Sequence, residues 1–327
     1  MWACMENIKL SGKREDLLAF AGELYYLEGL NQSEIARIIG VTRSMVSRML
    51  SEARAKGLVE IYVHRPVSRD VEMENALLEK FGLQEAYVLL QLSHHDPRFL
   101  NRLGALAANA LSEILKPGNL MGVVWGTSVS ASIDALQCIE DMRDRGVNVV
   151  QLVGALGSRT KAYNGYELVR RSSKFLGGEG YFLSAPFFLN SLETVRALME
   201  NKSISETLHI ARRCDVALLG VGSPQPDYAS FFLAGDMTME ELDDLIGDGA
   251  IGGICGLHFD VDGNLVGKDF SKRSVTIGVD DLMNIPVRIG VAGGTAKVMP
   301  ILGALRGNYI THLVTDTITA KQVLESA

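Results

Sequence analysis

Residues 32–50 read QSEIARIIGVTRSMVSRML. The hydrophobic pattern predicts two helices, 32–39 and 42–56, joined at Gly40. Ala36 is small where the two helices would cross, and Gly40 tolerates the positive φ that a tight turn requires. Apolar side chains stand where the helices would pack together, at Ile35, Ile39, Val41, Val46 and Met49. This combination predicts a helix-turn-helix.

The outward face of the second helix is rich in short hydroxyls and arginines. Such side chains suit base edges and phosphates in the major groove, which a helix can enter. An alternative is an ordinary helical hairpin whose second helix is polar because it faces solvent. Such a hairpin would not need the small residue, the glycine and the five apolar positions together. We therefore predict double-stranded DNA as a partner, with contacts from Gln32, Thr42, Arg43, Ser44, Ser47 and Arg48.

The flanking segments complete a small N-terminal domain. Apolar residues at helical spacing predict a helix over 13–28, and alternation over 58–64 predicts a strand that would form a wing. We therefore predict a winged helix-turn-helix domain over 1–66. A further helical pattern at 71–81 predicts a linker helix within 67–85.

The remainder, residues 86–327, is predicted to be a large effector domain of the α/β class. Short apolar runs alternate with helical patterns, which indicates a Rossmann-like parallel sheet covered on both faces. Strands are expected at 86–92, 120–125, 147–153, 215–220, 287–291 and 311–314. Helices are expected at 99–116, 128–137, 166–175, 191–199, 204–213, 295–305 and 317–325. Asp-Gly at 262–263, between apolar flanks, predicts a β-hairpin over 259–266.

Composition excludes several protein classes. The chain has 327 residues, 47% of them apolar and 22% charged, which is typical of globular proteins. No apolar run approaches the ~20 residues that span a bilayer, and the first residues lack the order of a signal peptide, so we expect a cytoplasmic protein without a membrane partner. The four cysteines are far apart and form no Cys-x-x-Cys pair, so neither a disulfide framework nor a metal site is expected.

Charge is distributed unevenly along the chain. Residues 1–66 hold nine Lys/Arg and eight Asp/Glu, a net charge of +1 in a protein of net charge −7. Within 37–65 there are six basic residues against two acidic ones. A single head of charge +1 would bind DNA weakly, so we expect a dimer or tetramer whose paired heads reach adjacent half-sites.

Three glycine-rich turns fall at the carboxyl ends of expected strands, where open α/β sheets bind their ligands. They are 124–128 (VWGTS), 219–224 (LGVGSP) and 290–297 (GVAGGTAK). One such turn means little, because strand-to-helix connections use glycine for geometric reasons alone; three of them, one with a lysine, favour an anion site at helix N-termini. We expect the effector to contact Gly126, Thr127, Ser128, Gly222, Gly293, Gly294 and Lys297. Neither a Walker-A motif nor Gly-x-Gly-x-x-Gly stands in a suitable context, so no nucleotide cofactor is expected.

With these motifs the sequence resembles the SorC/DeoR-type sugar-binding transcriptional regulators of bacteria, over nearly the whole chain. The matching stretches are 29–36 (GLNQSEIA), 46–50 (VSRML), 220–222 (GVG), 249–252 (GAIG), 291–294 (VAGG) and 313–316 (LVTD). The resemblance implies an effector domain similar to sugar-phosphate isomerases, a homo-oligomer, and operator binding modulated by a small sugar phosphate or polyol. It also implies that the turn 125–128 and Lys297 hold the phosphate.

One motif departs from the family pattern. The family sequence Gly-Ala-Val-Gly-Asp reads GAIGG at 249–253, so Gly253 replaces an aspartate that binds sugar hydroxyls. Asp248 and Asp260 are the carboxylates nearby that could substitute for it.

An alternative function is a sugar-phosphate isomerase or deaminase with an appended DNA-binding head. Such an enzyme needs a carboxylate or histidine beside the substrate carbonyl. Asp316 is the best candidate for this acid, although its position suits a cap of the following helix equally well. His94, His95 and Asp96 are expected in a solvated loop, and His209, His258 and His312 are expected to be structural histidines in apolar surroundings. We therefore expect a regulator and not an enzyme.

Overall fold

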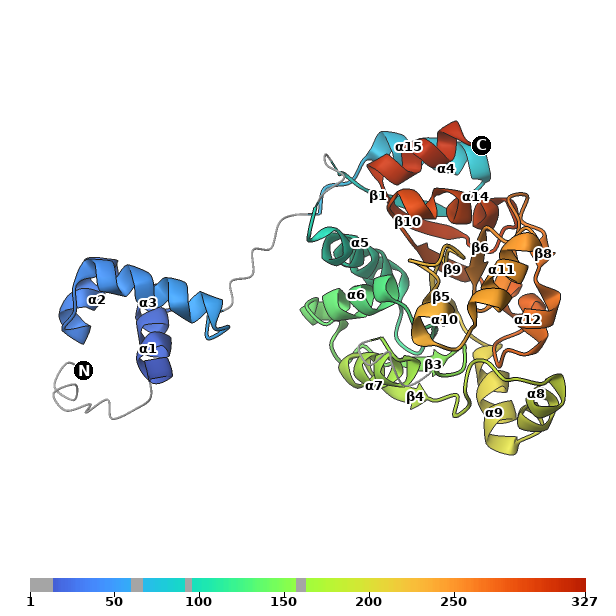
Figure 1. Ribbon diagram of the computed structural model, residues 1–327, viewed down its shortest axis with the longest axis horizontal. Coiled ribbons are helices and arrows are strands. Elements are labelled where there is room, and N and C mark those ends of the chain that lie inside the picture. Colours follow the sequence, from blue (N-terminus) through green and yellow to red (C-terminus); the bar gives the residue numbers. More distant parts are fainter. Residues whose placement is uncertain (1–13, 60–66, 92–95, 157–162) are drawn as a thin grey trace. The chain divides into compact units, whose positions relative to one another are not determined.

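The computed structural model describes residues 14–59, 67–91, 96–156 and 163–327 (Figure 1). They form two compact units, Met1–Pro66 and Val67–Ala327. Each unit is described by itself.

The first unit contains helices α1 (Arg14–Tyr26), α2 (Gln32–Ile39) and α3 (Arg43–Ala55). Asn31 and Glu34 form a capping box at α2: the Asn31 side chain accepts from the Glu34 N–H, and the Glu34 carboxylate accepts from the Asn31 N–H at 2.8 Å. Gly40, with φ 78°, ends α2. The predicted helix-turn-helix is therefore confirmed.

The core of this unit lies where the three helices meet. Its buried residues are Leu18, Ala21, Leu24, Ile35, Ala36, Val46, Met49, Leu50 and Ala53. Three of them, Ile35, Val46 and Met49, belong to the predicted packing set, and the other two predicted residues, Ile39 and Val41, are partly buried against this core. Ala36 is buried at the helix crossing, as predicted. Of the expected wing at 58–64, only Leu58 and Val59 belong to the described residues, so the rest of that prediction lies outside them.

A seven-stranded parallel sheet forms the centre of the second unit, in the order β1-β10-β9-β5-β2-β3-β4. All six expected strands are present, with shorter or slightly shifted ends. The bounds are β1 (Glu85–Leu89), β2 (Leu120–Val123), β3 (Val147–Gln151), β4 (Gly177–Tyr181), β5 (Val216–Gly220), β9 (Val287–Val291) and β10 (His312–Asp316).

Strand β4 was not predicted, because its sequence GGEGY lacks the apolar alternation of a strand. It pairs with β3 at one edge of the sheet. A Cβ at Gly178 would lie 2.0 Å from the Val147 carbonyl oxygen, so this close approach requires a glycine. The residue that weakens the strand pattern is thus the residue that the pairing needs.

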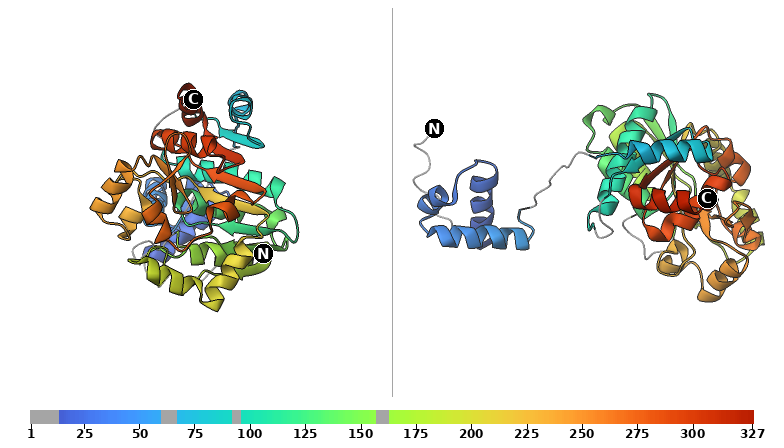
Figure 2. Two further views of the ribbon diagram at one scale, coloured as in Figure 1. Left: turned by 90° about the vertical axis from the view of Figure 1, so that its right-hand side faces the viewer. Right: turned by 90° about the horizontal axis from the view of Figure 1, so that it is seen from above.

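Helices cover both faces of the sheet, as Figures 1 and 2 show. One face carries α5 (Phe99–Ile114), α6 (Thr127–Leu136) and α7 (Gly165–Leu176). The other carries α4 (Val71–Phe81), α14 (Val298–Arg306) and α15 (Thr317–Glu325).

The expected linker helix, α4, lies within the second unit. Leu77 on α4 is fully buried in the large core. The Glu74 carboxylate, also buried, accepts from the Arg69 guanidinium at 2.7 Å and from the Val88 N–H of β1 at 2.8 Å. These contacts attach α4 to the edge of the sheet.

The remaining elements follow β4 and β5. A small antiparallel sheet contains β6 (Gly252–Ile254), β7 (Leu257–Phe259) and β8 (Leu265–Val266), so the expected hairpin is confirmed as β7 and β8. The helices are α8 (Leu192–Met199), α9 (Lys202–Ala211), α10 (Ser230–Ala234), α11 (Met239–Gly247), α12 (Lys268–Lys272) and α13 (Val279–Met283). Two 3₁₀ turns lie at η1 (Glu140–Met142) and η2 (Thr295–Lys297). Over the described ranges, no helix is long and apolar enough to cross a membrane.

Candidate functional site

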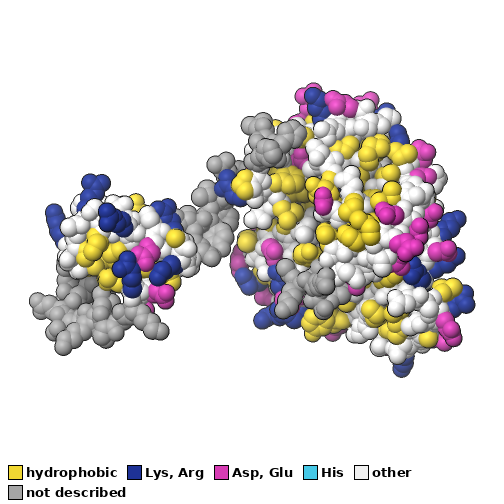
Figure 3. All heavy atoms as spheres, viewed as in Figure 1, with side chains coloured by type: hydrophobic (Ala, Val, Ile, Leu, Met, Phe, Trp, Pro, Cys, Tyr) yellow, Lys and Arg dark blue, Asp and Glu magenta, His cyan; other side chains and the backbone are white. Residues whose placement is uncertain are grey.

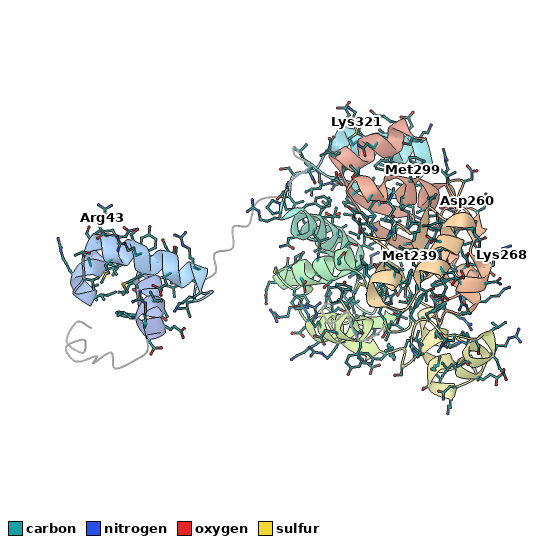
Figure 4. The ribbon with its side chains drawn as sticks, in the orientation of Figure 1. Arg43, Met239, Asp260, Lys268, Met299 and Lys321 are labelled. Atoms are coloured by element: carbon teal, nitrogen blue, oxygen red, sulfur yellow. The ribbon has the colours of Figure 1, made fainter. Side chains whose placement is uncertain are left out.

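The outward face of α3 carries polar side chains that the fold leaves exposed. Arg43, Ser44, Ser47 and Arg48 are exposed, whereas Val46 is buried on the opposite side of the helix. Figure 4 shows the Arg43 side chain extending away from the three helices. Neither arginine forms an ion pair with any residue that the structure describes, so both positive charges are uncommitted.

The other two residues expected at this face are partly used by the fold. The Thr42 hydroxyl caps α3 by accepting from the Met45 N–H at 3.3 Å, and it lies 3.0 Å from the Ser44 hydroxyl. Gln32 is half-buried at the start of α2. Thr42 therefore orients the first turn of α3 in addition to being exposed beside it.

Acidic side chains of the first unit pair near the other end of α3. Glu52 accepts from Arg14 at 2.7 Å and lies 3.6 Å from the Lys56 ammonium nitrogen. The hydrogen bond from Arg14 lowers the pKa of the Glu52 carboxyl. The negative charge of Glu52 is thus compensated by Arg14 and Lys56. The positive charges of Arg43 and Arg48 are not compensated in this way and could attract a polyanion.

In the second unit, a pocket opens at the carboxyl ends of three neighbouring strands. The sheet order places β9, β5 and β2 side by side, and each ends in one of the glycine-rich turns. The pocket volume is about 150 Å³, a size that holds a small organic molecule. Six of the seven expected effector contacts line it, namely Gly126, Thr127, Ser128, Gly222, Gly293 and Lys297.

Gly294 differs from that expectation, because it does not line the pocket. Its N–H donates to the Asp316 carboxylate at 3.0 Å and to the Thr319 hydroxyl at 2.7 Å. The amide is therefore used to hold the turn after β9 against the start of α15. A Cβ on the neighbouring Gly293 would lie 2.5 Å from the same carboxylate, which explains the glycine there.

The turn after β2 leaves the start of α6 open. No side chain caps this helix, whose N-cap is Gly126, so its first N–H groups have no side-chain acceptor. The Thr127 side chain is exposed, and the Ser128 hydroxyl donates to the Val291 carbonyl oxygen at 2.9 Å, joining this turn to β9. An anion would be stabilised by the free amides and the helix dipole.

Among the described residues that line the pocket, Lys297 supplies the only formal positive charge. It forms no ion pair within the described part of the chain, and burial lowers the pKa of its ammonium to about 8. No aspartate or glutamate lines the pocket in the part of the chain that the structure describes. The site is therefore electropositive at neutral pH.

Much of the pocket wall is apolar and aromatic. Trp125 and Phe231 line it edge-to-face, with ring centroids 5.1 Å apart, and the Trp125 indole N–H donates to the Gly154 carbonyl at 3.0 Å. Leu242 and Leu245 of α11 add aliphatic surface. Phe231 was not predicted to line the site, because the five-residue helix α10 that carries it is too short to show a helical period.

The histidines differ from their expected roles. His258 lines the pocket and is buried, yet its Nδ1 has no hydrogen-bond partner among the described residues, so the expectation of a satisfied structural histidine is wrong. His312 does fit that expectation, since its Nδ1 lies 2.9 Å from the Thr311 hydroxyl. His209 is exposed and not in apolar surroundings.

The acidic candidates lie outside the pocket. Asp316 caps α15 by accepting from the N–H groups of Ile318 and Thr319, at 3.1 and 3.0 Å. Asp248 is exposed, and the Asp260 carboxylate accepts from the Asn264 N–H at 2.8 Å; Asp260 is labelled in Figure 4. Gly253 lines the pocket, but Asp248 and Asp260 do not, so neither supplies the carboxylate that is absent at position 253.

The remaining candidate residues form no catalytic cluster. His94 and His95 lie outside the described residues, and Asp96 pairs with Arg102 at 2.9 Å. A search of the described ranges finds no group of three His, Cys, Asp or Glu that could hold a metal ion.

Comparison with known proteins assigns both units to families. Residues 65–325 match the sugar-binding domain family Sugar-bind, and residues 17–73 match the Crp-like helix-turn-helix domain. The sorbitol operon regulator of Klebsiella pneumoniae is 29% identical over 94% of this chain and 98% of that protein. The deoxyribonucleoside regulator of Bacillus subtilis is 30% identical over 95% and 98%. The crystal structure of the full-length sorbitol operon regulator superposes with a TM-score of 0.71, over 95% of this chain and 99% of that one.

Proposed function

The chain belongs to the SorC/DeoR-type family of sugar-binding transcriptional regulators, and we propose that it controls transcription by binding an operator through its first unit and a small phosphorylated sugar or polyol through its second. The observation that carries the effector half of this proposal is Lys297, whose ammonium has no ion-pair partner and no carboxylate beside it in the pocket among the described residues. The relatives are named as regulators of a sorbitol operon and of deoxyribonucleoside use, which agrees with a carbohydrate-derived effector.

DNA recognition is assigned to the exposed face of α3. Arg43 and Arg48 would contact phosphates or guanine edges, and the hydroxyls of Thr42, Ser44 and Ser47 would donate to acceptors in the major groove. Gln32, at the start of α2, would reach the backbone beside the groove. The uncommitted charge of the two arginines supports this assignment, because ion-paired arginines would give up part of their attraction for phosphate.

A homo-oligomer, a dimer or tetramer, would present two or more heads to one operator. The exposed apolar side chains of the second unit support this part of the proposal: Leu233, Met239 and Met299 are 54%, 47% and 41% exposed. Figure 3 shows hydrophobic side chains gathered on the face of this unit that it displays, and Figure 4 labels the two methionines. A second copy of the chain is the occupant that we propose for this surface.

Effector binding would change operator affinity by favouring one arrangement of the oligomer. A ligand shifts such an equilibrium only by its difference in affinity between the two arrangements. The turns after β2, β5 and β9 line one pocket, so a ligand held by Thr127, Gly222 and Lys297 would fix three strand ends at once. That restraint is the differential contact that the mechanism requires.

The enzyme alternative is disfavoured by the position of the acids. Asp316 is committed to capping α15. Of the described residues that line the pocket, His258 is the only histidine, and none of them is a carboxylate. Incubation with pentose and hexose phosphates separates the two functions. Turnover would support an enzyme, whereas a rise in Tm without turnover would support a sensor.

Two substitutions test the proposal by separating its two halves. Arg48→Ala is expected to weaken binding to a DNA site selected from random sequence by about 10- to 100-fold, because one groove contact is lost, while leaving ligand affinity unchanged. Lys297→Ala should abolish the ligand response and leave DNA affinity intact. Fluorescence anisotropy measures the first effect and calorimetric titration the second.

Arg54→Ala serves as the matched control, since Arg54 is also exposed on α3 but in its last turn. Full DNA affinity in the Arg48 variant would refute the groove assignment. An unchanged dose-response in the Lys297 variant would refute the anion site.

A further inference from the structure

His258 is a buried polar side chain in the pocket. It is only 4% exposed, and its Nδ1 has no hydrogen-bond partner within the described ranges. Buried polar groups in folded proteins are almost always hydrogen-bonded, and an exception points to a function or to a ligand. Because His258 lines the pocket, the missing partner is expected to come from a bound molecule.

The surroundings of His258 keep its ring neutral. Phe231 and Phe270 pack edge-to-face against it, with centroid distances of 5.7 and 5.1 Å. This burial lowers the pKa of the imidazole to about 4. A neutral imidazole offers one N–H donor and one acceptor, which suits a hydroxyl or carbonyl group and not an anion.

Residue 253 must be small, because the imidazole of His258 lies against it. Gly253 in β6 is the antiparallel partner of His258 in β7. A Cβ at Gly253 would lie 2.9 Å from Cδ2 and 3.2 Å from Nε2 of His258, so the imidazole occupies the space of a side chain at 253. Gly253 also exchanges two backbone hydrogen bonds with Gly222, of 2.8 and 3.2 Å, which joins this strand to the turn after β5.

The other polar groups of the pocket are few. Besides Lys297, His258 and the already paired Trp125 indole, the described lining side chains that can hydrogen-bond are the hydroxyls of Thr127, Ser128, Ser223 and Ser230 and the thiol of Cys255. No carboxylate or carboxamide is among these described residues. The Ser128 hydroxyl already donates to Val291, and the Ser223 hydroxyl accepts from the Gln225 N–H. A ligand rich in hydroxyls would therefore leave several of them unpaired against apolar walls.

We propose that His258 is the specificity-determining residue of this pocket, where its imidazole makes one hydrogen bond to a hydroxyl or carbonyl oxygen of the effector. The effector is then an anionic sugar derivative with few hydroxyls, such as a deoxy sugar phosphate. This inference rests on the proposed function, because it takes the pocket as the effector site, and it adds the chemical class of the ligand.

The test compares two probes that differ by one hydroxyl, 2-deoxyribose 5-phosphate and ribose 5-phosphate. Titration calorimetry on the full chain is expected to give at least tenfold tighter binding of the deoxy probe. His258→Phe keeps the aromatic packing and removes the hydrogen bond, so the affinity for the deoxy probe should fall by about tenfold. His258→Gln, whose amide reaches a similar position, should restore part of it.

Stability without ligand separates recognition from a structural role. His258→Phe removes an unpaired buried polar group, so the ligand-free Tm should stay equal or rise, whereas a structural histidine would give a lower Tm. Gly253→Ala provides an independent variant, because the added methyl group displaces the imidazole without removing it. This variant should also have a lower affinity for 2-deoxyribose 5-phosphate.

Each outcome bears on a definite claim. Equal or tighter binding of ribose 5-phosphate, or wild-type affinity in His258→Phe, would overturn the role of His258 while leaving the pocket as the effector site. Absence of binding by both probes and by inorganic phosphate to the wild-type chain would overturn the proposed function and this inference with it.

Discussion

Lys297 carries a charge that should titrate within an accessible pH range. Burial lowers its pKa to about 8 from an ordinary value of 10.5, so the ammonium loses its proton between about pH 7 and 9. A phosphate monoester is already doubly charged above pH 7 and does not change in this window. Affinity for a phosphorylated probe should therefore fall as pH rises through 8, measured by calorimetric titration at constant ionic strength.

The lowered pKa of Lys297 has the opposite effect on stability: ligand affinity falls as pH rises, whereas the free energy of unfolding increases. Between pH 8 and 10.5 the unfolded chain binds more protons at this lysine than the folded chain, so the contribution of Lys297 to the free energy of unfolding rises with pH. Lys297→Met should remove both trends. A probe affinity that is flat from pH 7 to 9 in the wild-type chain would contradict the assignment of Lys297 as the anion-binding group.

Arg288 is a buried charge that stabilises the sheet at the amino end of β9. Its guanidinium donates to four carbonyl oxygens, those of Met283, Ile285, Asn308 and Tyr309, at 2.6 to 3.1 Å. Burial lowers its pKa, and no carboxylate accompanies it within the described residues. The side chain thus ties the start of β9 to the segment before β10.

Arg288→Met should lower the free energy of unfolding by about 2 to 4 kcal/mol, because several buried carbonyls lose their donors. Urea unfolding followed by circular dichroism measures this loss. Arg213→Met is the control, since Arg213 is exposed and should change stability by less than about 0.5 kcal/mol. Equal stability of the two variants would show that water replaces the guanidinium at the four carbonyls.

At the scale of elements, local sequence rules are sufficient in the first unit. Gly40, Ala36 and the apolar spacing identify α2 and α3, because each requirement of the turn is met by a residue close in sequence. The six expected strands are also found, since each is a run of buried apolar residues.

The elements that were missed depend on distant contacts. β4 is a strand because Val147 approaches Gly178, and α10 is a helix of five residues that carries Phe231 to the pocket wall. The imidazole of His258 is likewise set by residues far along the chain, since Phe231 packs against it. No periodicity encodes such pairings, so the residues lining the glycine turns were predictable and the aromatic side of the pocket was not.

The capping box of α2 is an element whose loss can be measured. Asn31→Ala removes the acceptor for the Ser33 and Glu34 N–H groups and should cost about 1 kcal/mol of stability in the first unit. The α2–α3 turn would then be populated less completely, so DNA affinity should fall a few-fold while ligand affinity stays constant. Asn31→Asp, which keeps the acceptor, should retain both; a DNA affinity unaffected by Asn31→Ala would separate α2 from operator binding.

At the scale of the molecule, each unit has a main hydrophobic core of its own, and these two cores share no residue. The first contains Leu18, Ile35 and Val46 at the meeting of three helices, and the second runs through the seven-stranded sheet. A unit with its own core can unfold as a cooperative unit of its own. Enthalpy of unfolding scales with chain length, at about 0.7 kcal/mol per residue, so the second unit should unfold with several times the enthalpy of the first.

Differential scanning calorimetry of the full chain should therefore resolve two transitions of unequal area. A phosphorylated ligand that binds the pocket stabilises only the unit that holds it, so the larger transition should move to higher temperature as ligand concentration rises. Operator DNA should instead move the smaller transition to higher temperature. Asn31→Ala should lower only the smaller transition and Arg288→Met only the larger, which assigns each peak without separating the units. A single transition that both ligands and both substitutions shift together would mean that the two cores unfold as one, and that the division of the chain at residue 66 is geometric but not energetic.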